Sequence, residues 1–300
     1  MALSPNMRGA LFMASAMSLF TVNDACMKAL AGEVPLFQVI FLRGVLTTAL
    51  IALYLMATDR RAFILPSKER TLVALRALAE AGAAVFFFAA LFNMPLANLS
   101  AILQALPLTV TFAAWLFLKE PVGWRRLSAI LVGLCGVLLI VRPDADGFSL
   151  HAGFALLAVV FATTRDVLTR KLAPGTSSMT VTFATSAMVT VAAGIGSLFV
   201  TWVPLTLTSG GLIGIASILI LGAYLTIVLA MRQGELSFVA PFRYTSLLVA
   251  IVLGVVFFGE WPDTTTFLGA AIVVGSGLYT LHRERYAVPR PTVPTSTGKS

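Results

Sequence analysis

Seven ionisable side chains stand within or close to long apolar stretches of this 300-residue sequence. They are Asp24, Arg43, Arg76, Glu80, Arg165, Asp166 and Arg243. Charged groups in an apolar phase are expensive, so they usually face the interior of a helix bundle or a water-filled cavity. There a carboxylate can take up and release a proton, and a guanidinium can hold a carboxylate through two parallel hydrogen bonds. These residue types predict binding or proton-relay chemistry inside an apolar scaffold.

Three pairs of opposite charge have helical i,i+4 spacing, which leaves two interpretations open. The pairs are Asp24 with Lys28, Arg76 with Glu80, and Asp166 with Arg170. Residues four apart lie on one helix face and can neutralise each other. Alternatively, Asp24, Glu80 or Asp166 carries a proton as part of a proton or charge relay. Nothing in the sequence selects among these three carboxylates.

Two arginines, Arg43 and Arg243, have no obvious partner on their own helix. Either side chain could bind the carboxylate of a substrate. Arg43 could instead bridge two helices or pair with Asp24. Phe242 and Tyr244 flank Arg243 and are candidates for the same binding site.

Pro107 and Pro241 are expected to act as hinges within two of the apolar stretches. Proline lacks an N–H and disturbs the preceding helical turn, and a broken helix at membrane depth is tolerated where it lines a cavity. Gln104, close to Pro107, is therefore a candidate substrate-binding residue. The alternative is that small polar residues there bond to neighbouring helices.

Aromatic side chains could complete an apolar pocket. Tyr224 is the candidate substrate-binding residue among them. It lies in the part of the second half that matches a phenylalanine-rich stretch, residues 86–88, of the first half. Such phenylalanines also commonly face lipid or pack within a bundle, so both interpretations stay open.

The elements that must position these residues are membrane-spanning helices. Of all residues, 58% are hydrophobic and only 11% are charged, and apolar runs long enough to cross a bilayer recur along the chain. The predicted spans are 8–30, 36–57, 71–92, 96–118, 124–141, 151–171, 178–202, 209–231, 236–258 and 264–281. A Pro-, Thr- and Ser-rich tail, residues 283–300, has no apolar content to fold and is predicted to be disordered.

The distribution of basic residues predicts the orientation. With the N-terminus in the cytoplasm, the segments on that side hold Arg8, Arg60, Arg61, Lys68, Arg70, Lys119, Arg125, Arg126, Arg170, Lys171, Arg232, Arg283, Arg285, Arg290 and Lys299. The opposite segments hold only Lys28 and Arg142. By the positive-inside rule we expect ten spans, both termini in the cytoplasm, and a multi-pass protein of a bacterial-type inner membrane.

The two halves of the sequence resemble each other at an offset of 140 to 142 residues. The stretch 20–28 aligns with 162–170, Asn93 with Gln233, and Glu120 with Glu260. Each half holds five predicted spans, an odd number, so the halves must lie upside down relative to each other. The predicted fold class is an all-α integral membrane protein with ten transmembrane helices in two inverted five-helix repeats, residues 8–141 and 151–282. Inverted repeats are typical of secondary transporters.

Four stretches carry a resemblance to a known family. They are Asn23–Lys28, Phe41–Gly44, Ala90–Pro107 and Leu118–Glu120, the last with its counterpart Gly259–Glu260. With them, residues 8–282 resemble the EamA group of the drug/metabolite transporter superfamily. One departure is Leu247, which stands where Pro107 stands in the first half. The second half carries its proline in Ala240–Tyr244 instead, a variant similar to that of bacterial aromatic and neutral amino-acid exporters.

The resemblance implies a secondary transporter that exports a small metabolite, with an aromatic or neutral amino acid as the first candidate substrate. The alternatives are another metabolite (S-adenosylmethionine, riboflavin or a nucleotide-like compound) or a cationic drug. A channel and an intramembrane enzyme are the remaining classes, but no His-Glu-x-x-His or Gly-x-Ser-x-Gly arrangement is present. We therefore expect no enzyme activity, cofactor, metal or nucleic-acid partner. The expected partners are the substrate, the lipid bilayer and, in a homodimer, a second copy.

Overall fold

The computed structural model describes residues 4–58, 67–119, 122–142, 149–173, 176–233 and 236–287. Within these residues the protein is all-helical, without strands, and ten helices or helix pairs are long and apolar enough to cross a membrane. The predicted fold class is confirmed.

Eight of the ten spans are single helices. They are α1 (Pro5–Lys28), α2 (Leu36–Thr58), α3 (Arg70–Leu91), α6 (Trp124–Val141), α7 (Leu150–Arg170), α8 (Ser178–Ser197), α9 (Leu207–Gln233) and α12 (Thr264–Ala287). Most boundaries lie within a few residues of the predicted ones. The largest shortening is at α8, which ends at Ser197 rather than at residue 202, because Leu198 and Phe199 close the helix with tight i,i+3 bonds.

The fourth and ninth spans are interrupted. The fourth consists of α4 (Leu96–Leu103) and α5 (Leu106–Leu118), with Pro107 in the first turn of α5. The ninth consists of α10 (Leu236–Val239), a 3-10 helix η2 (Ala240–Tyr244) that contains Pro241, and α11 (Thr245–Phe258). Proline explains both breaks, since it cannot donate the backbone bond that would continue the preceding helix. Whether the breaks move as hinges stays a prediction.

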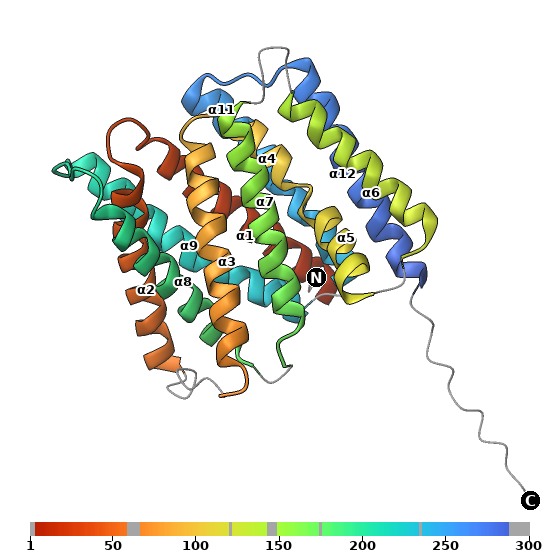
Figure 1. The fold of residues 1–300 in the computed structure, drawn as a ribbon, viewed down its shortest axis with the longest axis horizontal. Coiled ribbons are helices and arrows are strands. Elements are labelled where there is room, and N and C mark those ends of the chain that lie inside the picture. Colours follow the sequence, from red (N-terminus) through yellow and green to blue (C-terminus); the bar gives the residue numbers. More distant parts are fainter. Residues whose placement is uncertain are drawn as a thin grey trace, which may run out of the picture.

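Helix packing follows the repeat. Helix α1 packs on α9, and its counterpart α7 packs on α3, the counterpart of α9. Helices α2 and α8 pack on each other, as do α6 and α12, and α4 and α11. Exchanging the two halves leaves this set of pairs unchanged, as a two-fold axis between them requires. Figure 1 shows α6 and α12 side by side at one flank of the bundle.

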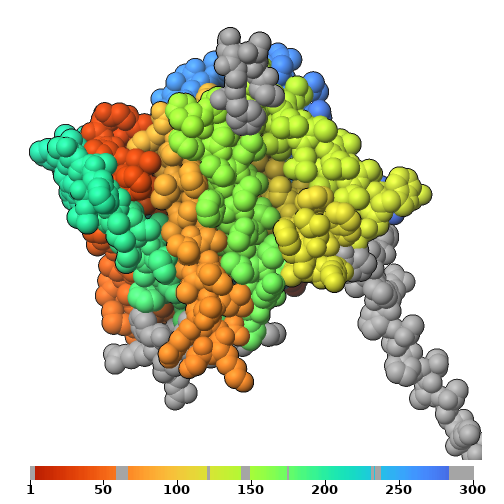
Figure 2. All heavy atoms as spheres, in the orientation of Figure 1, coloured from red at the N-terminus to blue at the C-terminus, as the bar shows by residue number. Residues whose placement is uncertain are grey.

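The two halves interlock rather than sit apart. Figure 2 shows α7, from the second half, seated between α3 and the α5–α6 region of the first half. The core is rich in alanine and includes Met27, Ile40 and Leu99, which are almost fully buried. Large apolar side chains such as Phe117, Phe257 and Leu198 are exposed on the outside. An outer surface of this kind suits lipid.

The C-terminal tail begins later than predicted. Residues 283–287 continue α12, so the predicted disordered segment cannot start at residue 283. The basic residues His282 and Arg283 near the C-terminal end favour this extension, because cations stabilise that end of a helix. The rest of the tail, and Glu120, lie outside the described residues.

Candidate substrate-binding site

Three of the seven apolar-phase charges form one ion-pair network between α3 and α7, and a fourth, Arg76, lies beside it on α3. Arg165 donates from Nη1 to Glu80 Oε2 and from Nε to Asp166 Oδ1, each at 2.7 Å. Arg76 donates to the hydroxyls of Thr169 on α7 and Thr185 on α8. The side chains of Glu80 and Arg165 are each 20% exposed. This ion-pair network (Glu80, Arg165 and Asp166) ties the two halves together, and the bonds of Arg76 to α7 and α8 add to the same interface.

A second polar group lies on α1 and α2. Asn23 donates from Nδ2 to Asp24 Oδ1 at 2.9 Å and accepts at Oδ1 from Arg43 Nη1 at 3.3 Å. The amide of Asn23 thus stands between the carboxylate and the guanidinium, and no ion pair within 4 Å joins Asp24 to Arg43 among the described residues. This amide-bridged pair (Asp24, Asn23 and Arg43) has the inter-helix geometry that the sequence offered as one alternative for Arg43.

Arg43 is 7% exposed, and both aromatic rings and polar groups surround its guanidinium. Its guanidinium stacks over the ring of Phe88 on α3, 4.8 Å from the centroid, and lies within electrostatic range of Tyr224 on α9. Its Nε has no hydrogen-bond partner among the described residues, nor has the buried hydroxyl of Thr47 one turn further along α2. Two unused donors on one face of α2 can bind an anionic oxygen without displacing an internal bond.

The interrupted spans meet at a polar contact. Gln104, between α4 and α5, donates to the hydroxyl of Ser246 on α11 at 2.7 Å. That hydroxyl donates in turn to the carbonyl of Arg243 in η2, and Thr21 on α1 bonds to the Ser246 carbonyl. Gln104 therefore bonds a neighbouring helix, as one of the two interpretations held, and links the two broken spans directly.

The remaining predicted binding residues lie on η2 and α9. Arg243 lies within electrostatic range of Asp166, and Tyr244 is buried against Gly277 of α12 with its hydroxyl unpartnered among the described residues. Phe242 is 37% exposed and packs near Phe238. Tyr224 contacts Phe20 of α1 edge-on, with 5.5 Å between centroids. A direct role of each in substrate binding stays a prediction.

One end of the bundle is closed by a lysine. Lys28, the last residue of α1, pairs with Glu260 at 2.9 Å and donates to the carbonyls of Leu91 and Met94. Glu260 also accepts from the backbone N–H of Leu96, at the start of α4. The closure joins α1, the α3–α4 turn and the end of α11.

The same-helix pairing expected from i,i+4 spacing is wrong for Lys28 and Glu80. Lys28 binds Glu260 instead of Asp24, and Glu80 binds Arg165 instead of Arg76. Asp166 accepts from its neighbour Arg165. Tertiary partners are chosen because a buried charge is costly to leave uncompensated, and helix packing brings these partners within 3 Å. An exposed helical pair contributes only a few tenths of a kcal/mol.

Sequence reasoning underrated three residues. In the sequence Asn23 stands out only as part of a motif and Glu260 only as the counterpart of Glu120, and Ser246 belongs to no motif. The repeat offered a signal for two of them: Gln104 and Ser246 are 142 residues apart, and so are Asn23 and Arg165. Residues at equivalent positions of inverted repeats meet only where both lie close to the axis that relates the halves, as Gln104 and Ser246 do.

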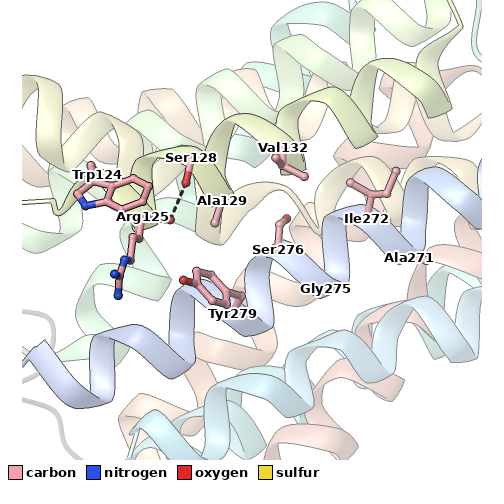
Figure 3. Close-up of a pocket in the computed structure, with 10 residues that line it drawn as sticks. All are labelled: Trp124, Arg125, Ser128, Ala129, Val132, Ala271, Ile272, Gly275, Ser276 and Tyr279. Carbon is pink, nitrogen blue, oxygen red and sulfur yellow. Dashed lines mark hydrogen bonds between the residues drawn. The ribbon is translucent and has the colours of Figure 1, made fainter.

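A cleft of about 570 Å³ lies on the outer flank, away from the ion-pair network and the amide-bridged pair. Figure 3 shows it between α6 and α12, with Trp124 and Arg125 towards one end and Val132 and Ile272 towards the other. Gly136 and Gly269 let the two helices approach closely, because a Cβ at either would meet the other's carbonyl oxygen within 3 Å. This cleft lacks the convergent charges of the interior and is a helix-packing surface.

The fold and the charged interior together define a polytopic membrane transporter with two repeated halves. The model of the EamA-like transporter family matches residues 7–142 and 150–281. The chain therefore belongs to the EamA-like transporter family, within the drug/metabolite transporter superfamily.

Curated relatives are similar at low identity. A pseudopaline exporter of Pseudomonas aeruginosa is 28% identical across 89% of this chain and 93% of its own length. An S-adenosylmethionine uptake transporter of Rickettsia bellii is 26% identical across 65% of this chain and 67% of its own. A riboflavin transporter of Vibrio cholerae is 29% identical across 66% of each.

A solved crystal structure supports the fold alone. It superposes with a TM-score of 0.67 at 20% identity and covers 93% of this chain and 99% of its own. The family and the names of the relatives are those of transporters rather than enzymes.

Proposed function

We propose that this protein exports a small zwitterionic metabolite of the amino-acid type, with neutral and aromatic amino acids as first candidates. The observation that carries the proposal is the amide-bridged pair, in which Arg43 and Asp24 are both present but form no direct ion pair. A zwitterion presents one carboxylate and one ammonium group, which matches one spare guanidinium and one spare carboxylate.

Arg43 is the proposed anchor for the substrate carboxylate. Its free Nε and the free hydroxyl of Thr47 lie on one face of α2, and a desolvated guanidinium binds carboxylate more strongly than an exposed one. Phe88 and Tyr224 beside it offer apolar surface to the substrate side chain.

Alternating access follows from the repeat. If the two halves exchange their conformations, the end closed by Lys28 and Glu260 opens and the opposite end closes. The breaks at Pro107 and Pro241 are the proposed hinges, and the proposed orientation places both termini in the cytoplasm of a bacterial-type inner membrane.

A second candidate substrate class comes from the relatives. Transporters of S-adenosylmethionine, pseudopaline and riboflavin are similar to this chain. An S-adenosylmethionine substrate would use the same Arg43 and Asp24 through its methionine group. Riboflavin would depend instead on the aromatic residues.

The test is transport by purified protein in liposomes. We expect saturable uptake of labelled neutral or aromatic amino acids, lowered about tenfold or more by Arg43→Ala, because a charge-assisted hydrogen bond is lost. Arg125→Ala, which removes an exposed arginine on the outer flank, is the matched control. Uptake of S-adenosylmethionine but no amino acid would select the second class. Uptake of riboflavin that is insensitive to Arg43→Ala would contradict the zwitterion site.

A further inference from the structure

The buried carboxylates of this protein are not equivalent. Glu80 and Asp166 share Arg165 at 2.7 Å, and Glu260 holds Lys28 at 2.9 Å. Asp24 has only the neutral amide of Asn23. Among the described residues it alone of these four carboxylates has no cation within 4 Å.

We propose that Asp24 is the cation subsite of the transporter, where the substrate's ammonium group and a proton bind in turn, so that export is coupled to proton entry. This proposal rests on the proposed function, because it takes the substrate to be a zwitterion.

The groups around Asp24 explain why its charge stays uncompensated. On its own helix lie Asn23 and Cys26, and on α2 lies Arg43. Tyr224 of α9 and Glu80 of α3 interact with Arg43 rather than with Asp24 itself. Arg43 is the nearest cation by interaction, yet its Nη1 bonds the Asn23 carbonyl oxygen. The amide therefore holds the two charges apart and keeps both available.

A bare carboxylate in such a place costs several kcal/mol unless a proton or a cation neutralises it. A proton and an ammonium group bind the same two oxygens, so occupancy by one excludes the other. The empty carrier then returns with a proton on Asp24, and the loaded carrier leaves with the zwitterion. One zwitterion moves out as one proton moves in, so one net positive charge enters per cycle.

The repeat supports a single coupling site. At the position equivalent to Asp24, the second half has Asp166, and where the first half has Asn23 the second has Arg165. Arginine there neutralises Asp166 at 2.7 Å. Of these two equivalent carboxylates in the described structure, Asp24 alone has no cation within 4 Å.

The first experiment measures proton release when a transported amino acid binds purified protein in weakly buffered detergent solution. We expect about one proton released per substrate bound in the wild type and none in Asp24→Asn. Asp263→Asn, at an exposed carboxylate before α12, is the matched control and should release protons as the wild type does. Wild-type binding without proton release would overturn the proposal and leave the proposed function standing.

The second experiment measures accumulation in proteoliposomes. A gradient of one pH unit should drive about tenfold accumulation at one proton per substrate, and a potassium–valinomycin potential should drive it as well. Asp24→Asn should lose both responses. If Asp24→Asn does not fold, Asp24→Glu takes its place. This variant keeps a carboxylate and should keep coupling, with a shifted pH midpoint. Gradient-driven accumulation by folded Asp24→Asn would overturn the proposal. Transport of no zwitterion by the wild type would remove both this proposal and the proposed function.

Discussion

The ion-pair network and the amide-bridged pair are built on equivalent positions of the two halves, Arg165 with Asp166 and Asn23 with Asp24, but differ in what they leave unused. Arg165 pairs with both Glu80 and Asp166, each at 2.7 Å. Asn23, at the equivalent position, separates Asp24 from Arg43 and leaves an arginine nitrogen without a partner. A duplicated scaffold can thus hold the halves together with one copy of a motif and keep binding capacity in the other. We expect substitutions in the network to affect stability and those in the pair to affect transport.

Arg165→Ala should have the largest effect on stability. It leaves Glu80 and Asp166 buried without their cation, and breaking a buried pair from one side costs about 3–5 kcal/mol. Thermal unfolding in detergent should show a large loss of stability, whereas Arg43→Ala should unfold close to the wild type and lose transport. If Arg43→Ala were the more destabilised of the two, the division between network and pair would be wrong.

Lys28→Met should act on the end of the bundle where Lys28 pairs with Glu260, rather than on the ion-pair network or the amide-bridged pair. Three acceptors lose one charged donor, a loss of about 2–3 kcal/mol for the closed state. Cys26, in the same last turn of α1, should then react at least about fivefold faster with a membrane-impermeant thiol reagent.

The labelling assay uses a Cys135→Ser background, because Cys135 is exposed. Lys171→Met, at an exposed lysine after α7, is the control and should label as the parent does. An unchanged labelling rate in Lys28→Met would show that the lysine does not hold this end shut.

Gly277→Ala should have the smallest effect on stability, about 1–2 kcal/mol. A Cβ at Gly277 would overlap the hydroxyl of Tyr244, so the tyrosine must leave its place in η2, next to Arg243. Transport should fall several-fold if η2 lines the route. Gly275→Ala on the same helix meets nothing within 4 Å and should be neutral. Equal transport by both variants would exclude Tyr244 from the route.

Much of the architecture was predictable because membrane spans are set by local physics. Apolar length fixes each helix, proline fixes the breaks in the fourth and ninth spans, and an odd number of spans per half fixes their inversion. The ionisable candidates were also found, because charges in apolar runs are rare enough to stand out.

Sequence alone determined the spans, the repeat and the family, and it named Asp24, Arg43, Glu80 and Asp166 among the candidate site residues. It could not say which of them pair. Spacing suggested partners on the same helix, but long side chains reach across helix interfaces, where a buried charge is costly unless a partner lies within reach. Only the tertiary structure set Arg165 between Glu80 and Asp166, brought Lys28 to Glu260, and left Asp24 facing an amide instead of a cation. Which carboxylate stays free depends on helix packing, because packing decides which charges come within reach.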